Sequence, residues 1–236
     1  MTRHKNKRDR APNETPDNLV TQAYTGIRRM LFLNEIAPGQ KLHYRDLAEQ
    51  LGMSPTPVTQ ALKWLEFQGL VHHRTNRGFY MEPISLEEVR EIYDLREALE
   101  LALLPKALEN LDENSIGRLR SALEDYLKVS TNRYLKQRLL KDMEFHLTLA
   151  GLSDCRITLR ILRHLFDLLY LKYKAEILFS RPMEDVDTEH KKIFDRLVAR
   201  DLKGARRALE HHLHTVRDHV LDNIQQVLEE KETLVF

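Results

Sequence analysis

The stretch HYRDLAEQLGMSPTPVTQALKWLEFQGLVHHRTNRGFYME, residues 43–82, decides the fold of the N-terminal part of the chain. A short helix ends at Gly52, because a glycine readily takes the left-handed conformation that closes a helix. A second helix begins with Ser54 as its N-cap and Pro55 at the first helical position, where the missing N–H costs nothing. After Gly69, two short strands flank an Asn-Arg-Gly turn. Two helices joined by a tight turn and followed by a hairpin predict a winged helix-turn-helix.

The pattern continues upstream of this stretch. DNLVTQAYTGIRRMLFLNE, residues 17–35, spaces its apolar side chains as an amphipathic helix does, and the APG that follows ends the helix. We therefore expect a winged helix-turn-helix DNA-binding domain over residues 17–83. Residues 1–16 are polar, contain two prolines and show no periodicity, which predicts a disordered basic arm.

The chain changes character after Pro83. Ser85 and Glu88 form a capping box that opens a long helix, and no convincing strand follows up to about residue 230. Short polar connections separate six expected helices, as in an antiparallel bundle, over residues 85–109, 112–129, 132–152, 155–179, 184–199 and 202–229. The predicted fold is mainly α: an N-terminal winged helix-turn-helix and a C-terminal all-helical antiparallel bundle of about six helices, residues 84–230.

The composition narrows the class of protein. Of 236 residues, 42% are hydrophobic and 31% are charged, as in soluble globular proteins. No apolar run reaches the roughly 18 residues that a membrane span needs, so we expect no membrane partner. No apolar segment follows the charged start MTRHKNKRDR, so we expect no signal peptide either. The single cysteine, Cys155, excludes an internal disulfide, and these features together predict a cytoplasmic protein.

Charge is unevenly distributed along the chain. Residues 1–80 hold twelve Lys or Arg and seven Asp or Glu, whereas residues 81–236 hold 25 and 29. A net charge of +5 followed by −4 suggests that the first part meets a polyanion, although +5 over eighty residues is also ordinary.

The helix-turn-helix supplies candidate DNA contacts. A recognition helix presents its first turns to the major groove, where short polar and basic side chains reach base edges. The candidates on this helix are Ser54, Thr56, Thr59, Gln60 and Lys63, with Arg45 on the preceding helix and Arg74, Arg77 and Gly78 on the wing. Each position alone fits a solvated polar face equally well. The turn, the wing and the basic arm together favour double-stranded DNA as the partner.

A second group of candidates lies in the predicted bundle. Asp142 and His146, four residues apart, share one helix face with several leucines, so this face points into the bundle. His190 and His212 each lie on a similar apolar face, whereas His211 and His214 point elsewhere.

The spacing of these residues suggests that they converge. His190 lies eleven residues before Asp201, and His212 lies eleven residues after it. If ARD, residues 199–201, is the turn of a helical hairpin, the two imidazoles return to the same height. One carboxylate and three imidazoles suit a divalent transition metal, with Zn²⁺ favoured and Ni²⁺ or Mn²⁺ as alternatives. The other possibility is that each histidine hydrogen-bonds separately in a metal-free core.

The N-terminal motifs resemble those of a known family. The PG before KL, the LAEQLGMS, the TPV..AL..L...GLV and the RGFYM are similar, with matching spacing, to the DNA-binding domain of the GntR family of bacterial transcription regulators. The helical remainder resembles the FCD effector domain of the FadR-like branch, and the two resemblances together cover about residues 17–228.

The chain departs from the family pattern at two positions. Pro55 and Thr59 stand where the family usually has arginines that contact DNA, whereas Arg45 matches an arginine often used for that purpose. We therefore expect an operator unlike the common one, with the wing and arm carrying more of the affinity. Fewer cationic contacts also predict a shallower dependence of DNA affinity on salt.

The FCD resemblance has its own implications for the bundle. The family's metal-binding members carry their ligands where this chain has Asp142, His146, His190 and His212. In the family, the open coordination positions take an effector carboxylate or water. Arg96 matches an inward arginine that could pair with such a carboxylate. The alternative for Arg96 is a surface salt bridge with Glu100.

These observations lead to one main hypothesis and two alternatives. The main hypothesis is a homodimeric transcription regulator, a repressor, that binds a pseudo-palindromic operator and senses a small organic acid through a metal-containing pocket. One alternative is a metal-dependent hydrolase with an appended basic domain, although no inward acid is left over as a general base. The other keeps DNA binding and omits the metal.

Overall fold

The computed structural model describes residues 16–129, 135–178 and 183–233. The chain forms two compact units that divide between Glu82 and Pro83. The expected basic arm, residues 1–16, lies almost wholly outside the described residues. Among the helices that are described, none is long and apolar enough to cross a membrane.

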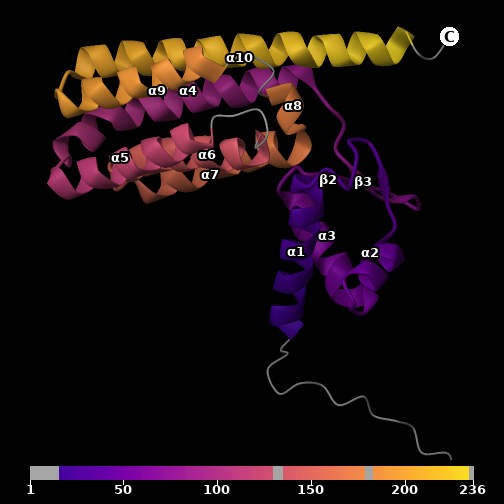
Figure 1. Ribbon diagram of the computed structural model, residues 1–236. Coiled ribbons are helices and arrows are strands. Elements are labelled where there is room, and N and C mark those ends of the chain that lie inside the picture. Colours follow the sequence, from indigo (N-terminus) through magenta and orange to yellow (C-terminus); the bar gives the residue numbers. More distant parts are fainter. Residues whose placement is uncertain (1–15, 130–134, 179–182, 234–236) are drawn as a thin grey trace, which may run out of the picture. The chain divides into compact units, whose positions relative to one another are not determined.

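The N-terminal unit combines short helices with a small sheet (Figure 1). Its elements are α1 (Pro16–Phe32), β1 (Lys41–Leu42), α2 (Tyr44–Gln50), α3 (Pro55–Phe67), β2 (Val71–Arg74) and β3 (Gly78–Met81). The sheet is antiparallel in the order β1-β3-β2, and the hairpin register places Val71 opposite Met81 and Arg74 opposite Gly78. The predicted winged helix-turn-helix is therefore confirmed. Strand β1 was not predicted, because a strand of two residues is too short to show the alternation of apolar and polar side chains that marks a strand in sequence.

The turn between α2 and α3 forms as its residues suggest. Gly52 has φ of +65° and follows Leu51, the C-cap of α2, and Ser54 occupies the N-cap of α3 with extended backbone. The Ser54 side chain makes no capping hydrogen bond, so its hydroxyl is exposed at the start of the helix. Val58 and Leu62 of α3 and Ile27 of α1 are fully buried, and Leu47 of α2 is 5% exposed; because α3 packs against both other helices, the three share one core.

Helices are the only regular elements among the described residues of the C-terminal unit. Six long helices and one short one follow in order: α4 (Leu86–Glu109), α5 (Glu113–Lys128), α6 (Leu135–Gly151), α7 (Arg156–Lys172), α8 (Ala175–Leu178), α9 (Met183–Val198) and α10 (Leu202–Thr233). Helix α10 packs along α4 and α9, whereas α6 packs against α5 and α7 (Figure 1). Helix α4 also contacts α6 and α7, so it joins these two sets of helices. The predicted mainly α fold with a helical bundle is confirmed.

One predicted helix is interrupted. The helix expected over residues 155–179 ends at Lys172, because Tyr173 has extended backbone with φ of −112° and ψ of 142°. The Tyr173 hydroxyl donates to the Ser85 carbonyl at 3.1 Å and lies 3.2 Å from a carboxylate oxygen of Glu88. Lys172, which is buried, pairs with the same Glu88. The end of α7 is thus attached to the first turn of α4, an arrangement that depends on residues far apart in sequence.

Candidate metal centre and DNA-binding surface

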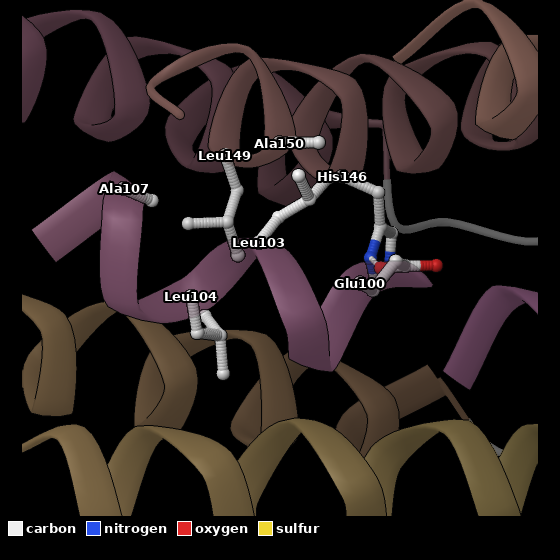
Figure 2. A pocket seen from close by; sticks show the side chains of 7 residues that line it. All are labelled: Glu100, Leu103, Leu104, Ala107, His146, Leu149 and Ala150. Atoms are coloured by element: carbon white, nitrogen blue, oxygen red, sulfur yellow. Dashed lines mark hydrogen bonds and ion pairs between the residues drawn. The ribbon is translucent and has the colours of Figure 1, made fainter. Parts of the chain in front are cut away.

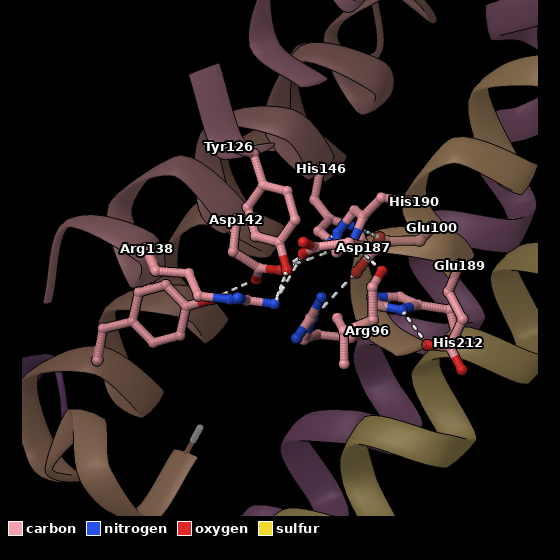
Figure 3. Close-up of polar contacts among 12 residues, drawn as sticks. Arg96, Glu100, Tyr126, Arg138, Asp142, His146, Asp187, Glu189, His190 and His212 are labelled. Atoms are coloured by element: carbon pink, nitrogen blue, oxygen red, sulfur yellow. Dashed lines mark hydrogen bonds and ion pairs between the residues drawn. The ribbon is translucent and has the colours of Figure 1, made fainter. Parts of the chain in front are cut away.

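Four buried side chains from three helices meet at one point in the bundle (Figure 3). Asp142 and His146 come from α6, His190 from α9 and His212 from α10. Each offers one potential ligand atom, and these atoms all lie within 4.8 Å of one another. The structure thus brings together the four residues that the sequence singled out.

The α9–α10 hairpin aligns two of the histidines. Arg200 takes φ of +54° at the turn, and Asp201 caps α10 by accepting a hydrogen bond from the Gly204 N–H at 2.8 Å. The rings of His190 and His212 consequently lie side by side, with centroids 4.4 Å apart. His190 and His212 lie at the same height because each is eleven residues from Asp201 and both helices have the same rise per residue.

Each imidazole is held through its Nδ1 atom. His146 Nδ1 lies 2.6 Å from a Glu100 oxygen, His190 Nδ1 lies 2.9 Å from the Val186 carbonyl, and His212 Nδ1 lies 2.9 Å from a Glu189 oxygen. An acceptor at Nδ1 places the proton there and leaves Nε2 with a free lone pair. The Nε2 atoms of His146 and His190 are buried and have no hydrogen-bond partner among the described residues.

Asp142 faces these lone pairs. Its Oδ2 accepts a hydrogen bond from the Tyr170 hydroxyl at 2.6 Å, and its Oδ1 lies 3.3 Å from His190 Nε2 and 3.9 Å from His146 Nε2. When the histidine protons are on Nδ1, the Nε2 atoms of His146 and His190 are acceptors, as is the Asp142 carboxylate. These acceptors face one another across a buried space. Such an arrangement is costly unless a cation lies between them. One carboxylate and three imidazole nitrogens are a donor set that divalent transition metals accept, so the residues present fit a metal ion.

The electrostatics of the cluster favour ligand-competent protonation states. Burial lowers the pKa of His190 and lowers that of His212 further, because the charged imidazolium loses its hydration. Burial alone would raise the pKa of Asp142, but the nearby His190 and His146 rings and the Arg96 charge hold it well below its usual range. Metal binding requires neutral imidazoles and an ionised carboxylate.

Arg96 lies beside the cluster rather than on the surface. Its Nε donates to Glu100 at 2.9 Å, and both side chains are about 3% exposed. The expected alternative of a salt bridge is thus present, but it is buried. The Arg96 guanidinium stacks on Phe166 at 4.1 Å, and its Nη2 has no hydrogen-bond partner among the described residues. Burial lowers the pKa of an arginine, but Glu100 raises that of Arg96 above its usual value.

Sequence reasoning missed the role of Glu100. Burial would raise its pKa, but His146 and Arg96 hold this pKa below its usual range. Figure 2 shows Glu100 and His146 at one end of a narrow crevice between α4 and α6. The remaining lining is apolar: Leu103, Leu104, Ala107, Leu149 and Ala150. Helical spacing of Glu100 with Leu103, Leu104 and Ala107 was a signal that it points inward.

A second buried guanidinium was also missed. Arg138, one turn before Asp142 on α6, is fully buried and contacts the Tyr126 hydroxyl. It also donates to Asp187 of α9 at 3.0 Å (Figure 3). Arg138 therefore connects α5, α6 and α9 close to the metal centre.

The candidate DNA contacts lie on the surface of the N-terminal unit. Those on the two helices, Arg45, Ser54, Thr56, Gln60 and Lys63, are exposed, and Thr59 is half-buried. The Thr59 hydroxyl donates to the Pro55 carbonyl at 2.9 Å, so its hydrogen is already used in a hydrogen bond within the helix.

The wing residues are arranged around a tight turn. Arg74 and Arg77 are exposed, and the Arg74 guanidinium lies 4.8 Å from the centre of the Tyr80 ring. Gly78 has φ of +92°, a conformation that favours glycine over other residues. The turn therefore holds two cationic side chains at the tip of the hairpin.

Comparison with known families matches both units. The model of bacterial regulatory proteins of the gntR family matches residues 19–81, and the model of the FCD domain matches residues 91–215. The two matches fall within the two units of the structure.

Individual proteins resemble the chain over most of its length. The uncharacterized HTH-type transcriptional regulator YdhC of Bacillus subtilis is 25% identical over 218 residues, which cover 92% of this chain and 96% of that protein. The HTH-type transcriptional repressor RspR of Escherichia coli is 28% identical over 202 residues, or 84% of this chain and 87% of that protein. The structure of E. coli McbR/YncC has the same fold, with a TM-score of 0.74 at 24% identity, covering 89% of this chain and 98% of that one. This chain therefore belongs to the GntR family of bacterial regulatory proteins and, with its C-terminal FCD domain, is a DNA-binding transcription regulator rather than an enzyme.

Proposed function

We propose that this regulator is a homodimeric repressor that senses a small organic acid through a divalent metal ion held by Asp142, His146, His190 and His212. The observation that carries the proposal is the convergence of buried acceptors. Nδ1 of each histidine lies against a carboxylate or carbonyl oxygen, and the Nε2 atoms of His146 and His190, left with free lone pairs, face Asp142. Histidines that served only the core would use both ring nitrogens for hydrogen bonds.

The charge around the centre supports a divalent ion. With neutral imidazoles, the described charged groups around the centre leave two negative charges, because two guanidiniums face four carboxylates: Arg96 and Arg138 against Glu100, Asp142, Glu189 and the partly exposed Asp187. A divalent cation would bring the cluster to neutrality. Zn²⁺ is the favoured ion because it readily takes imidazole and carboxylate ligands, with Ni²⁺ and Mn²⁺ as alternatives.

Arg96 is the proposed anchor for the acid. Its Nη2 is a buried donor with no acceptor among the described residues, and a buried unsatisfied donor costs about 1–3 kcal/mol. A ligand carboxylate would satisfy this donor. A metal ion at the neighbouring centre would add positive charge that attracts the same group.

The position of Arg96 on α4 suggests how binding would reach the DNA-binding unit. Helix α4 begins at Leu86, a few residues after Pro83, and its first turn is attached to the end of α7 through Tyr173 and Lys172. Helix α7 also carries Tyr170, which holds Asp142. An acid that favours one arrangement of α4 and α7 would therefore shift the segment around Pro83 and change DNA affinity.

The hydrolase alternative has weaker support. Glu100 and Glu189 are inward acids that the sequence did not reveal as such, but each is engaged by a histidine Nδ1. Neither is thus free to act as a general base. The family comparisons also place the chain among regulators.

Metal analysis of untagged protein tests the proposal. We expect about one divalent transition ion per chain, its loss in the His190→Ala variant, and its retention in the His211→Ala variant. DNA binding should persist in the metal-free protein, whereas release of DNA by small carboxylic acids should require the metal. Wild-type protein that retains no ion after dialysis against excess Zn²⁺ would overturn the proposal and favour purely structural histidines.

A further inference from the structure

We propose that Glu100 is a positioning residue that couples the effector-binding arginine to the metal centre, so that the acid and the metal ion bind cooperatively. This inference rests on the proposed function, because it assumes a metal ion at the four donors and an acid at Arg96. It adds the residue through which the two sites communicate.

The geometry of Glu100 supports this role. One carboxylate oxygen accepts from Arg96 Nε at 2.9 Å, and the other lies 2.6 Å from His146 Nδ1. The Glu100 side chain is about 3% exposed, so water contributes little to its solvation. A single carboxylate therefore bridges the two groups that the proposed function assigns to the acid and the metal ion.

The surroundings of Glu100 strengthen the coupling. The apolar crevice between α4 and α6 lies against Glu100 and His146 (Figure 2). Charge interactions are stronger in such a low-dielectric setting than in water. A change in charge at Arg96 is therefore transmitted to His146 with little screening.

The direction of the effect follows from competition for the carboxylate. Arg96 draws negative charge toward one Glu100 oxygen and so weakens the other oxygen as an acceptor for His146. An acid bound to Arg96 would take up part of the guanidinium charge, and Glu100 would then accept more strongly from His146 Nδ1. A stronger acceptor at Nδ1 makes the imidazole a better metal ligand. Linkage requires the metal ion to strengthen acid binding by the same factor.

Glu189 provides a matched comparison. It holds His212 Nδ1 at 2.9 Å, as Glu100 holds His146. Its other oxygen lies 3.6 Å from His211, whose side chain is 69% exposed. Both glutamates should support metal binding, but only Glu100 lies between a metal ligand and Arg96.

Zinc affinity in a pair of double-mutant cycles tests the inference without any effector. Competition with a chromophoric chelator would measure the Kd for Zn²⁺ in wild-type protein, in Glu100→Gln, in Arg96→Met and in the double variant. The second cycle measures the same Kd with Glu189→Gln in place of Glu100→Gln, again alone and combined with Arg96→Met. We expect each glutamine variant to bind zinc about 10–100-fold more weakly. We expect the effect of Arg96→Met to differ by about fivefold or more between the wild-type and Glu100→Gln backgrounds, and by less than about twofold in the Glu189 cycle.

The possible outcomes separate the inference from the proposed function. Zinc binding by the wild-type protein with an additive Glu100 cycle would overturn the coupling and leave the metal site standing. Absence of zinc binding by the wild-type protein would overturn both. Circular dichroism checks that each variant keeps its helices. If Glu100→Gln does not fold, Glu100→Asp replaces it, because a carboxylate one methylene shorter cannot span both partners and should abolish the same coupling.

Discussion

His211 and His212 are adjacent in sequence but have different environments. His212 is 2% exposed within the bundle, whereas the His211 side chain is 69% exposed, because successive helical residues lie about 100° apart. This contrast gives a matched pair of variants for the metal centre.

Zinc should stabilise the wild-type protein through His212. A ligand at 100 times its Kd adds about 2.7 kcal/mol to the free energy of unfolding, which is roughly 5–10 °C in Tm for a chain of this size. Differential scanning fluorimetry of metal-free protein with and without Zn²⁺ should show this shift in wild type and in His211→Ala, but not in His212→Ala. An equal shift in both variants would exclude His212 as a ligand.

Two buried histidines of the cluster, His190 and His212, predict a pH dependence for the metal-free protein. The pKa of His190 and of His212 lies below the ordinary value of 6.5 because burial disfavours the charged ring. Below pH 6.5 the unfolded chain therefore binds protons that the native chain does not. The free energy of unfolding consequently decreases as the pH is lowered, by up to about 1.4 kcal/mol per pH unit for each histidine. Above pH 6.5 these groups contribute no slope. Urea unfolding at pH 7.5, 6.5 and 5.5 should show a weaker decline for His212→Gln than for wild type.

At the scale of elements, α3 and the wing present the proposed DNA surface. Lys63 is exposed on α3, so Lys63→Ala should weaken binding to all sequences and reduce the slope of log K against log salt by about 1. Fluorescence anisotropy with a duplex selected by the wild-type protein, measured at several KCl concentrations, would report both effects. Lys203→Ala, an exposed change in the C-terminal unit, should alter neither. An unchanged slope for Lys63→Ala would remove this residue from the interface.

The joint between α7 and α4 is a second element-scale feature. Tyr173→Phe removes a hydroxyl that contacts Ser85 and Glu88, and the loss of such a hydrogen bond costs about 1 kcal/mol. Chemical denaturation would measure this loss. If the joint transmits effector binding, Tyr173→Phe should retain zinc affinity and yet show a reduced response of DNA binding to acids. A full response would show that the signal takes another route.

At the scale of the whole molecule, we expect two chains on each operator. A pseudo-palindrome presents two equivalent half-sites, which a symmetric dimer can occupy together. Sedimentation equilibrium should therefore give a mass near twice the 27.9 kDa of one chain, with the same two-chain stoichiometry on DNA. A monomer that saturates the duplex one chain at a time would contradict this expectation.

Local patterns accounted for much of the fold and for the four central donors. Gly52, Ser54 and Pro55 marked the helix-turn-helix because their backbone preferences act over a few residues. Helical periodicity turned Asp142, His146, His190 and His212 inward, and their spacing about Asp201 set two of them at one height. Family motifs then added the DNA-binding and FCD assignments, which the family models support.

The supporting groups around those donors were decided only by the tertiary structure. Glu100 meets His146 across 46 positions and Tyr173 meets Ser85 across 88, while Arg138 pairs with Asp187 on another helix. Periodicity tells which face of a helix is buried, because burial follows from the side chain's own polarity and its place in the turn. It does not tell which buried groups touch, because that depends on the angles and offsets at which whole helices pack. The sequence by itself thus determined the elements and the inward donors, and the packing of the helices determined how those donors are held.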